Sequence, residues 1–96
     1  MRGRYTATAR IEVEEILAHI AGDNVSAATA VGAAIKLAVA QLQAFPRLGT
    51  ITDEAGIFLK IARPYRYLIF YSATGDTIIV RNVRHPARQY PPVDRS

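Results

Sequence analysis

The C-terminal half of the sequence gathers residue types that could act on a phosphodiester. Cleavage of RNA through its own 2′-hydroxyl needs a base for that proton, an acid for the leaving oxygen, and cations that stabilise the charge on the phosphorane. The residues of these types are Arg63, Arg84, His85, Arg88 and Tyr90, with Glu54 as a remote candidate base. Their spacing does not fix a geometry, so the same residues also suit a binding surface without catalysis.

Each aromatic or imidazole candidate has a second interpretation. The ordinary pKa of a histidine lies near neutrality, so His85 could serve as acid or base, or it could be a contact residue at the end of a strand. Tyr90, beside Gln89 and two prolines, could stack on a nucleobase or cover a sheet edge. We expect His19 to be a solvated helix residue.

Positive charge is concentrated in the C-terminal third. The net charge is +4, and ten of the twelve basic residues are arginines, whose planar fork suits phosphate and carboxylate partners. Between residues 60 and 90, Asp76 is the only acid, and the basic residues are Lys60, Arg63, Arg66, Arg81, Arg84 and Arg88. This pattern indicates an acidic partner, and it leaves nucleic acid and an acidic protein segment as alternatives.

Strand geometry divides these arginines into two groups. Side chains alternate along a strand, so we expect Arg81 and Arg84 on opposite faces of the sheet. Arg84 and Arg88, on either side of Pro86, are the pair expected to contact a target. Arg81 is expected to neutralise an acidic partner segment or a glutamate of the first helix.

Composition limits the class of protein. The sequence of 96 residues predicts a single domain over 1–96 with an irregular tail from about residue 86. Because cysteine is absent and there are only two histidines, we expect no disulfide, metal site or cofactor. We also expect no membrane span, because no apolar run reaches about 18 to 20 residues, and no secretory signal, which makes the cytoplasm the default location.

Two helices are predicted in the first half of the chain. Apolar residues recur at helical spacing after the potential cap Thr6, and Glu12, Glu15 and His19 are assigned to the other side. A second helix is expected from Ala27 to Ala44, with Val31, Ile35, Ala38 and Leu42 on its inner face. A link of about three to five residues, with Asn24 or Ser26 as the second cap, predicts an antiparallel helix hairpin.

Strands are predicted at both ends of this hairpin. Residues Arg4 to Thr6 resemble the end of a short first strand, and Thr50 to Gly56 is predicted to be a loop. Three β-branched and aromatic runs follow, covering Ile57–Ile61, Tyr65–Ser72 and Thr77–Val83. The middle run is apolar on both faces, which indicates a central strand, and its tyrosines Tyr65, Tyr67 and Tyr71 are assigned mainly to the core.

Five short motifs follow one another along the chain. The first is Thr6-x-x-Ala9-x-x-Glu12-Val13, and the other four are GDNVSAAT between the helices, Phe45-Pro46-x-x-Gly49 after the second helix, Tyr67-Leu68-Ile69-Phe70-Tyr71, and Val83-x-His85-x-x-Arg88. Over about residues 4 to 90 they resemble the motifs of RelE/ParE toxins, the toxins of type II toxin-antitoxin systems. The first is similar to the opening S/T-x-x-A-x-x-D-L of these toxins, with glutamate and valine in place of aspartate and leucine.

The resemblance implies an α+β fold: a short N-terminal strand and an antiparallel helix hairpin packed on an antiparallel sheet with a three-stranded meander. It favours the ParE branch over the RNA-cleaving RelE branch, because the loop Thr50 to Gly56 holds Asp53 and Glu54 and no lysine. A ParE-like toxin is implied to be non-enzymatic and to trap DNA gyrase on cleaved DNA. The alternatives are a RelE-like ribonuclease that cleaves messenger RNA and a degenerate toxin.

The resemblance also implies a hetero-oligomer with a ParD-like antitoxin, whose acidic segment folds on the toxin. We assign the target-binding role to Arg84, His85, Arg88 and Tyr90. We assign the antitoxin-binding role to Lys60, Arg63, Arg66 and Arg81.

Overall fold

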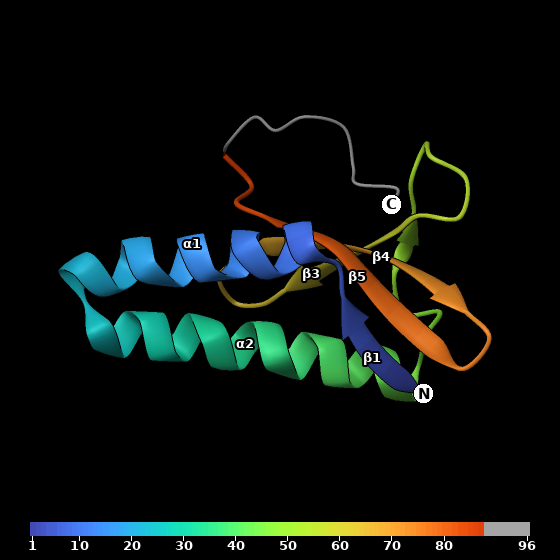
Figure 1. Cartoon of the computed structure of the whole chain (residues 1–96), viewed down its shortest axis with the longest axis horizontal. Helices are drawn as coiled ribbons and strands as arrows, with labels where there is room; N and C mark the ends of the chain where they lie inside the picture. The colour runs from blue at the N-terminus through green and yellow to red at the C-terminus, as the bar shows by residue number, and fades with distance from the viewer. Residues whose placement is uncertain (88–96) are drawn as a thin grey trace.

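The computed structural model describes residues 1–87 and shows two helices on one face of a five-stranded sheet (Figure 1). The chain runs in the order β1 (Arg2–Tyr5), α1 (Ala7–Asp23), α2 (Val25–Ala44), β2 (Thr50–Ile51), β3 (Phe58–Ala62), β4 (Tyr67–Thr74) and β5 (Thr77–Arg84). The strand order across the sheet is β1-β5-β4-β3-β2. The expected α+β fold is therefore confirmed, with β4 as the central strand.

The helix hairpin has a shorter link than the sequence predicted. Thr6 caps α1 by accepting a hydrogen bond from the backbone N–H of Ala9 at 3.0 Å, as expected. Asn24 alone separates the helices and caps α2 through the N–H of Ala27, also at 3.0 Å. The second helix consequently begins at Val25, two residues earlier than predicted.

The core lies between α2 and the sheet. Val31, Ile35, Ala38 and Leu42 of α2 are all buried, which confirms the predicted inner face. They pack in one cluster with buried residues of the sheet, namely Ala62, Tyr67, Ile69, Tyr71, Ile78, Val80 and Val83. The sequence expectation that no stretch is long enough for a membrane span was wrong for α2, which has 20 residues and includes an 18-residue stretch with a mean hydropathy of 1.6. Here that apolar character serves the core of a globular fold.

The sheet differs from the prediction at both edges. β1 pairs in parallel with β5, while all other neighbours are antiparallel, so the sheet is mixed. The segment Thr50–Gly56 was predicted to be a loop, but Thr50 and Ile51 form β2 against Leu59 and Phe58. Two residues are too few to show an alternating pattern, so this strand could not be predicted from the sequence.

The meander also begins and ends differently from the prediction. Tyr67 and Tyr71 are buried, as assigned, but Tyr65 is 43% exposed and lies in the turn before β4. That turn spans residues 63 to 66, where Arg66 has the left-handed φ of 67° and its N–H donates to Ala62 O at 2.8 Å. The turn removes Tyr65 from the strand and directs its side chain away from the core.

Candidate functional site at the junction of α1 and β5

A bulge in β5 determines where its arginines lie. Phe70 pairs with Asn82 and Tyr71 pairs with Val80, so Arg81 is the extra residue that shifts the register of β5. The extra residue resets the alternation, so Arg84 pairs with Leu68 on the face away from the helices, the same face as Ser72. Arg81 donates from Nε to Ser72 Oγ at 2.9 Å. The expectation that Arg81 and Arg84 occupy opposite faces was therefore wrong.

Glu12 connects α1 to the residues after the bulge. Its Oε1 accepts hydrogen bonds from Asn82 Nδ2 and from the backbone N–H of Val83, both at 3.0 Å. Its Oε2 lies 3.9 Å from Arg84 Nε. The sequence assigned Glu12 to the solvent side of the helix, and this was wrong: Glu12 is three residues after the buried Ala9 and four before the buried Ile16, which places it on the face toward the sheet.

The opening motif, Thr6-x-x-Ala9-x-x-Glu12-Val13, therefore holds α1 against β5. Thr6 caps α1 and also donates its hydroxyl hydrogen to Arg81 O at 2.9 Å, directly at the bulge. Ala9 is fully buried, and its small side chain allows α1 to approach the strand closely. Glu12 then satisfies the polar groups that follow the bulge, including the side chain of Asn82, which is 1% exposed.

The side chain of Arg84 is held inside this junction and not in solvent. Arg84 is 8% exposed, its guanidinium lies beside Glu12, and its Cζ is 5.6 Å from the centre of the Phe70 ring. A contact of Arg84 with a target, as predicted from the sequence, would require an exposed side chain, whereas the structure buries it. A burial of this extent means that substituting Arg84 changes the stability of the fold as well as any contact with a target.

His85 continues the junction beyond the end of β5. Its ring meets that of Tyr67 edge-on, with ring centres 5.6 Å apart, and its Nδ1 accepts the N–H of Ala87 at 3.0 Å. The other predicted target-binding residues, Arg88 and Tyr90, lie outside the described residues. Within residues 1–87, Arg84 and His85 thus set the direction in which the chain leaves the sheet.

The remaining members of the possible ribonuclease set come from other parts of the fold. Glu54 lies in the loop between β2 and β3, where its N–H donates to Thr52 Oγ1 at 3.1 Å. The same loop lines a hollow with Ser72, Ala73 and Thr74, toward the far end of β4 from Tyr67 and His85. Arg63 is exposed in the turn between β3 and β4. Within residues 1–87, no group of three potential metal-ligating side chains could hold a metal ion.

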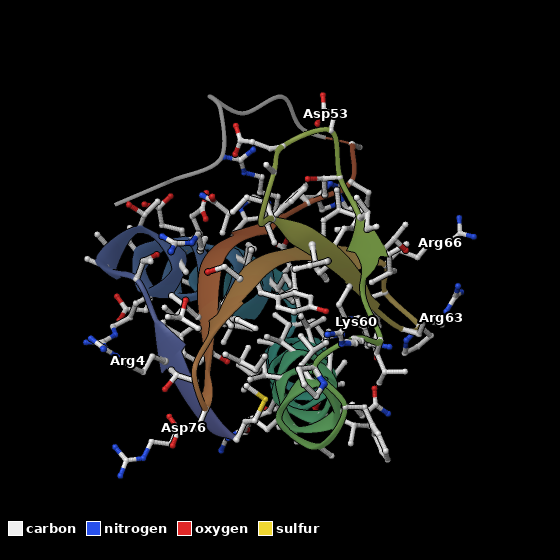
Figure 2. The ribbon with its side chains drawn as sticks, turned by 90° about the vertical axis from the view of Figure 1, so that its right-hand side faces the viewer. Arg4, Asp53, Lys60, Arg63, Arg66 and Asp76 are labelled. Atoms are coloured by element: carbon white, nitrogen blue, oxygen red, sulfur yellow. The ribbon has the colours of Figure 1, made fainter. Side chains whose placement is uncertain are left out.

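The four residues assigned to antitoxin binding do not form one surface. Lys60, Arg63 and Arg66 lie on the side of the molecule formed by β3 and its following turn, with Arg4 and Asp76 on the other side (Figure 2). Arg81 is on β5, next to Ser72 of β4. The structure therefore brings three of the four together and separates Arg81 from them.

A second motif fixes the segment between α2 and β2. The Tyr71 hydroxyl donates to Pro46 O at 2.8 Å and accepts the N–H of Gly49 at 2.9 Å. A Cβ atom at position 49 would collide with that hydroxyl, which explains the glycine. Burial raises the pKa of the Tyr71 phenol above its usual value of 10.0, and the hydrogen bond from Gly49 lowers it by less.

The fold and its interactions define a small basic α+β protein in which Glu12 holds α1 against β5 and Tyr71 holds the segment after α2 against β4. Comparison with protein families identifies the family directly. A model described as "ParE toxin of type II toxin-antitoxin system, parDE" matches residues 4–90, so the chain belongs to the ParE toxin family.

The fold comparison agrees with this family. The chain resembles a solved structure described as "Chromosomal ParDE TA system from P. aeruginosa", with a TM-score of 0.70 and 14% sequence identity over 88% of this chain and 95% of that one. At this identity the likeness shows the fold. A comparison with curated proteins gave no match.

Proposed function

We propose that this ParE-family toxin arrests growth by binding DNA gyrase, without enzymatic activity of its own, and that a ParD-like antitoxin neutralises it. The observation that carries the proposal is that the side chains of Arg84 and His85 make contacts within the fold. Arg84 contacts Glu12 and Phe70, and His85 contacts Tyr67 and Ala87. These contacts favour a positioning role at the start of the tail over acid-base chemistry, which needs groups free to reach a substrate.

The family supports the rest of the proposal. The ParE family model names the parDE system, and the similar solved structure is that of a ParDE system, which supports an antitoxin partner. His85, with Arg88 and Tyr90 of the following segment, stays the proposed contact with gyrase. Both partners would be met in the cytoplasm, which is the location that we propose.

The test is a supercoiling assay with purified gyrase and purified chain. We expect inhibition of supercoiling, accumulation of cleaved DNA, and relief of both effects when the antitoxin is added first. In cells, expression of the chain alone should induce an SOS reporter. Unaffected gyrase at large molar excess, together with new RNA 5′ ends by primer extension, would replace this proposal with a RelE-like ribonuclease.

A further inference from the structure

The outer edge of β3 is only partly covered. β2 pairs with Phe58 and Leu59, and within residues 1–87 no strand pairs with the outer side of the three residues that follow. Backbone groups of an antiparallel strand point alternately to its two neighbours. The N–H of Thr52, directly after β2, donates to Ile57 O at 3.3 Å, so the C=O of Ile57 points toward β2. Leu59 and Ile61, two and four residues later, therefore direct their N–H and C=O groups to the same outer side of β3. Ile61 therefore presents a backbone donor and acceptor at an open edge.

The hydrogen bonds of the Tyr71 hydroxyl explain why β2 does not extend along the rest of β3. To pair with Ile61, β2 would have to extend backward from Thr50 through Gly49 and Leu48. Gly49 and Pro46 are instead bound to the Tyr71 hydroxyl from the central strand. The chain is thus drawn away from the edge of β3 at the residue before β2, and the open edge is a consequence of the fold.

A basic surface with apolar side chains adjoins this edge. A hollow of about 220 Å³ between α2 and β3 has Leu37 and Gln41 on one side and Lys60, Ile61 and Arg63 on the other, and we call these five residues the β3 edge surface. Leu37 is 61% exposed although it is a large apolar residue. No carboxylate lines the hollow. Within residues 1–87, neither Lys60 nor Arg63 makes an ion pair.

Arg66 extends the positive charge beyond the hollow. It lies in the turn that follows β3, and Figure 2 shows its side chain and that of Arg63 extending outward from the same side of the molecule. Its φ of 67° is a conformation that glycine or asparagine would adopt more easily. An arginine kept in that conformation is consistent with selection for its side chain.

We propose that the β3 edge surface docks an extended acidic segment of the antitoxin, which adds a short strand beside Ile61. This inference rests on the proposed antitoxin partnership and specifies its surface. Main-chain hydrogen bonds to Ile61 fix the segment, an apolar side chain occupies the hollow against Leu37, and carboxylates pair with Lys60, Arg63 and Arg66. Arg81 is outside this surface. Pairing with a second copy of the chain is disfavoured, because these cations would face their own counterparts.

The test measures binding of the full-length chain to the antitoxin encoded beside its gene. Arg63→Glu and Leu37→Glu alter exposed side chains of the surface, so both variants should stay folded. We expect each to raise the Kd at least tenfold. Arg4→Glu is the matched control, because it reverses an exposed arginine on β1, the opposite edge strand, and it should change the Kd less than threefold.

Hydrogen exchange tests the strand itself. The amide of Ile61 should become protected when the antitoxin binds, and it should stay unprotected in the Arg63→Glu variant at the same antitoxin concentration. Normal affinity of both surface variants, or an Ile61 amide that exchanges equally fast in the complex, would overturn the proposal. The proposal would also be overturned if the isolated chain formed a dimer and the Arg63→Glu variant were a monomer, since the edge would then serve self-association.

A growth assay separates this inference from the proposed function. The Arg63→Glu chain should remain toxic when expressed alone and should inhibit gyrase as the wild type does, while the antitoxin no longer rescues the cells. If the wild-type chain leaves gyrase fully active while Arg63→Glu still raises the Kd for the antitoxin, the gyrase proposal alone is overturned. A wild-type chain that does not bind the neighbouring product would overturn the antitoxin partnership and the docked segment together.

Discussion

The carboxylate of Glu12 joins α1 to the end of β5. Its replacement by alanine removes the acceptor of the hydrogen bonds from Asn82 Nδ2 and the Val83 N–H, and the carboxylate 3.9 Å from Arg84 Nε, in a largely buried place. We expect Glu12→Ala to lower the free energy of unfolding by on the order of 2 to 4 kcal/mol. Urea denaturation measures this loss. Glu12→Gln keeps one oxygen acceptor and should cost less, and equal effects of the two variants would show that the carboxylate charge is decisive.

The buried phenol of Tyr71 makes stability sensitive to alkaline pH. Its folded pKa is raised above 10.0 by burial, and so is that of Tyr5, so the folded state holds these protons after the unfolded chain has released them. Their contribution is therefore fully present below pH 10.0 and is lost as the pH rises through the folded values. We expect the free energy of unfolding to fall above about pH 10.

Tyr71→Phe provides the comparison for this pH dependence. The variant should be less stable at pH 7, because Pro46 O and the Gly49 N–H lose their partner, by about 1 to 3 kcal/mol. Its alkaline decline should be shallower than that of the wild type. A decline of unchanged slope between pH 9 and 11 would assign the effect to other groups.

Several of these residue roles could not be read from the sequence. The spacing of Glu12 from Ala9 and Ile16 contained a signal, but a charged residue on an apolar face is expected in solvent unless its partners are known. Those partners, Asn82 and Val83, are 70 and 71 residues away and reach Glu12 only because β5 bulges at Arg81. The placement of Arg84 depends on the same bulge. A one-residue insertion in a strand leaves the pattern of residue types almost unchanged and reverses every side chain after it.

The second helix, α2, offers a matched pair of leucines. Leu42 is fully buried in the core, whereas Leu37 is 61% exposed on the same helix. We expect Leu42→Ala to cost about 2 to 5 kcal/mol, because the substitution leaves a cavity. Leu37→Ala should change stability by less than about 0.5 kcal/mol. Thermal unfolding distinguishes the two, and a similar loss in both would mean that α2 packs against the sheet by another face.

The elements themselves were the most predictable part of the molecule. Both helices and the three strands of the meander follow from periodicity, and Thr6 was identified as the cap of α1 from its residue type alone. The sequence could not predict β2, which has two residues and exists because it pairs with Phe58 and Leu59. It also misplaced Tyr65, because the turn that excludes it requires a left-handed arginine, which is a rare choice for that conformation.

The arginines of the C-terminal third have different roles that substitution can separate. Arg84 is buried beside Glu12, so Arg84→Ala should destabilise the fold, by about 1 to 3 kcal/mol, as well as reduce toxicity. We expect Arg88→Ala to reduce toxicity with an unchanged melting temperature. Growth inhibition and thermal unfolding of the two variants, measured at equal expression, test this division. A destabilised but fully toxic Arg84→Ala chain would remove Arg84 from any role in positioning the tail.

The net charge of +4 and its distribution also determine how the toxin should meet its antitoxin. Lys60, Arg63 and Arg66 lie on one side of the molecule without an ion pair among residues 1–87, so they create a field that attracts an acidic segment before contact (Figure 2). Such steering is screened by salt, because the Debye length shrinks from about 10 Å at 0.1 M to about 3 Å at 1 M. We expect the association rate constant to fall at least about tenfold between 0.05 and 0.5 M salt, with a smaller change in the dissociation rate constant. Stopped-flow mixing of chain and antitoxin measures both.

The slope of that salt dependence identifies the charges responsible. Arg63→Glu changes the local charge of the β3 edge by two units and should flatten the slope, whereas Arg4→Glu changes the net charge equally on the opposite side and should flatten it less. Equal slopes for the two variants would mean that the antitoxin responds to the net charge of the toxin. An association rate indifferent to salt in the wild type would mean that these arginines do not guide the antitoxin, and the basic side of β3 would then have to be assigned to the target.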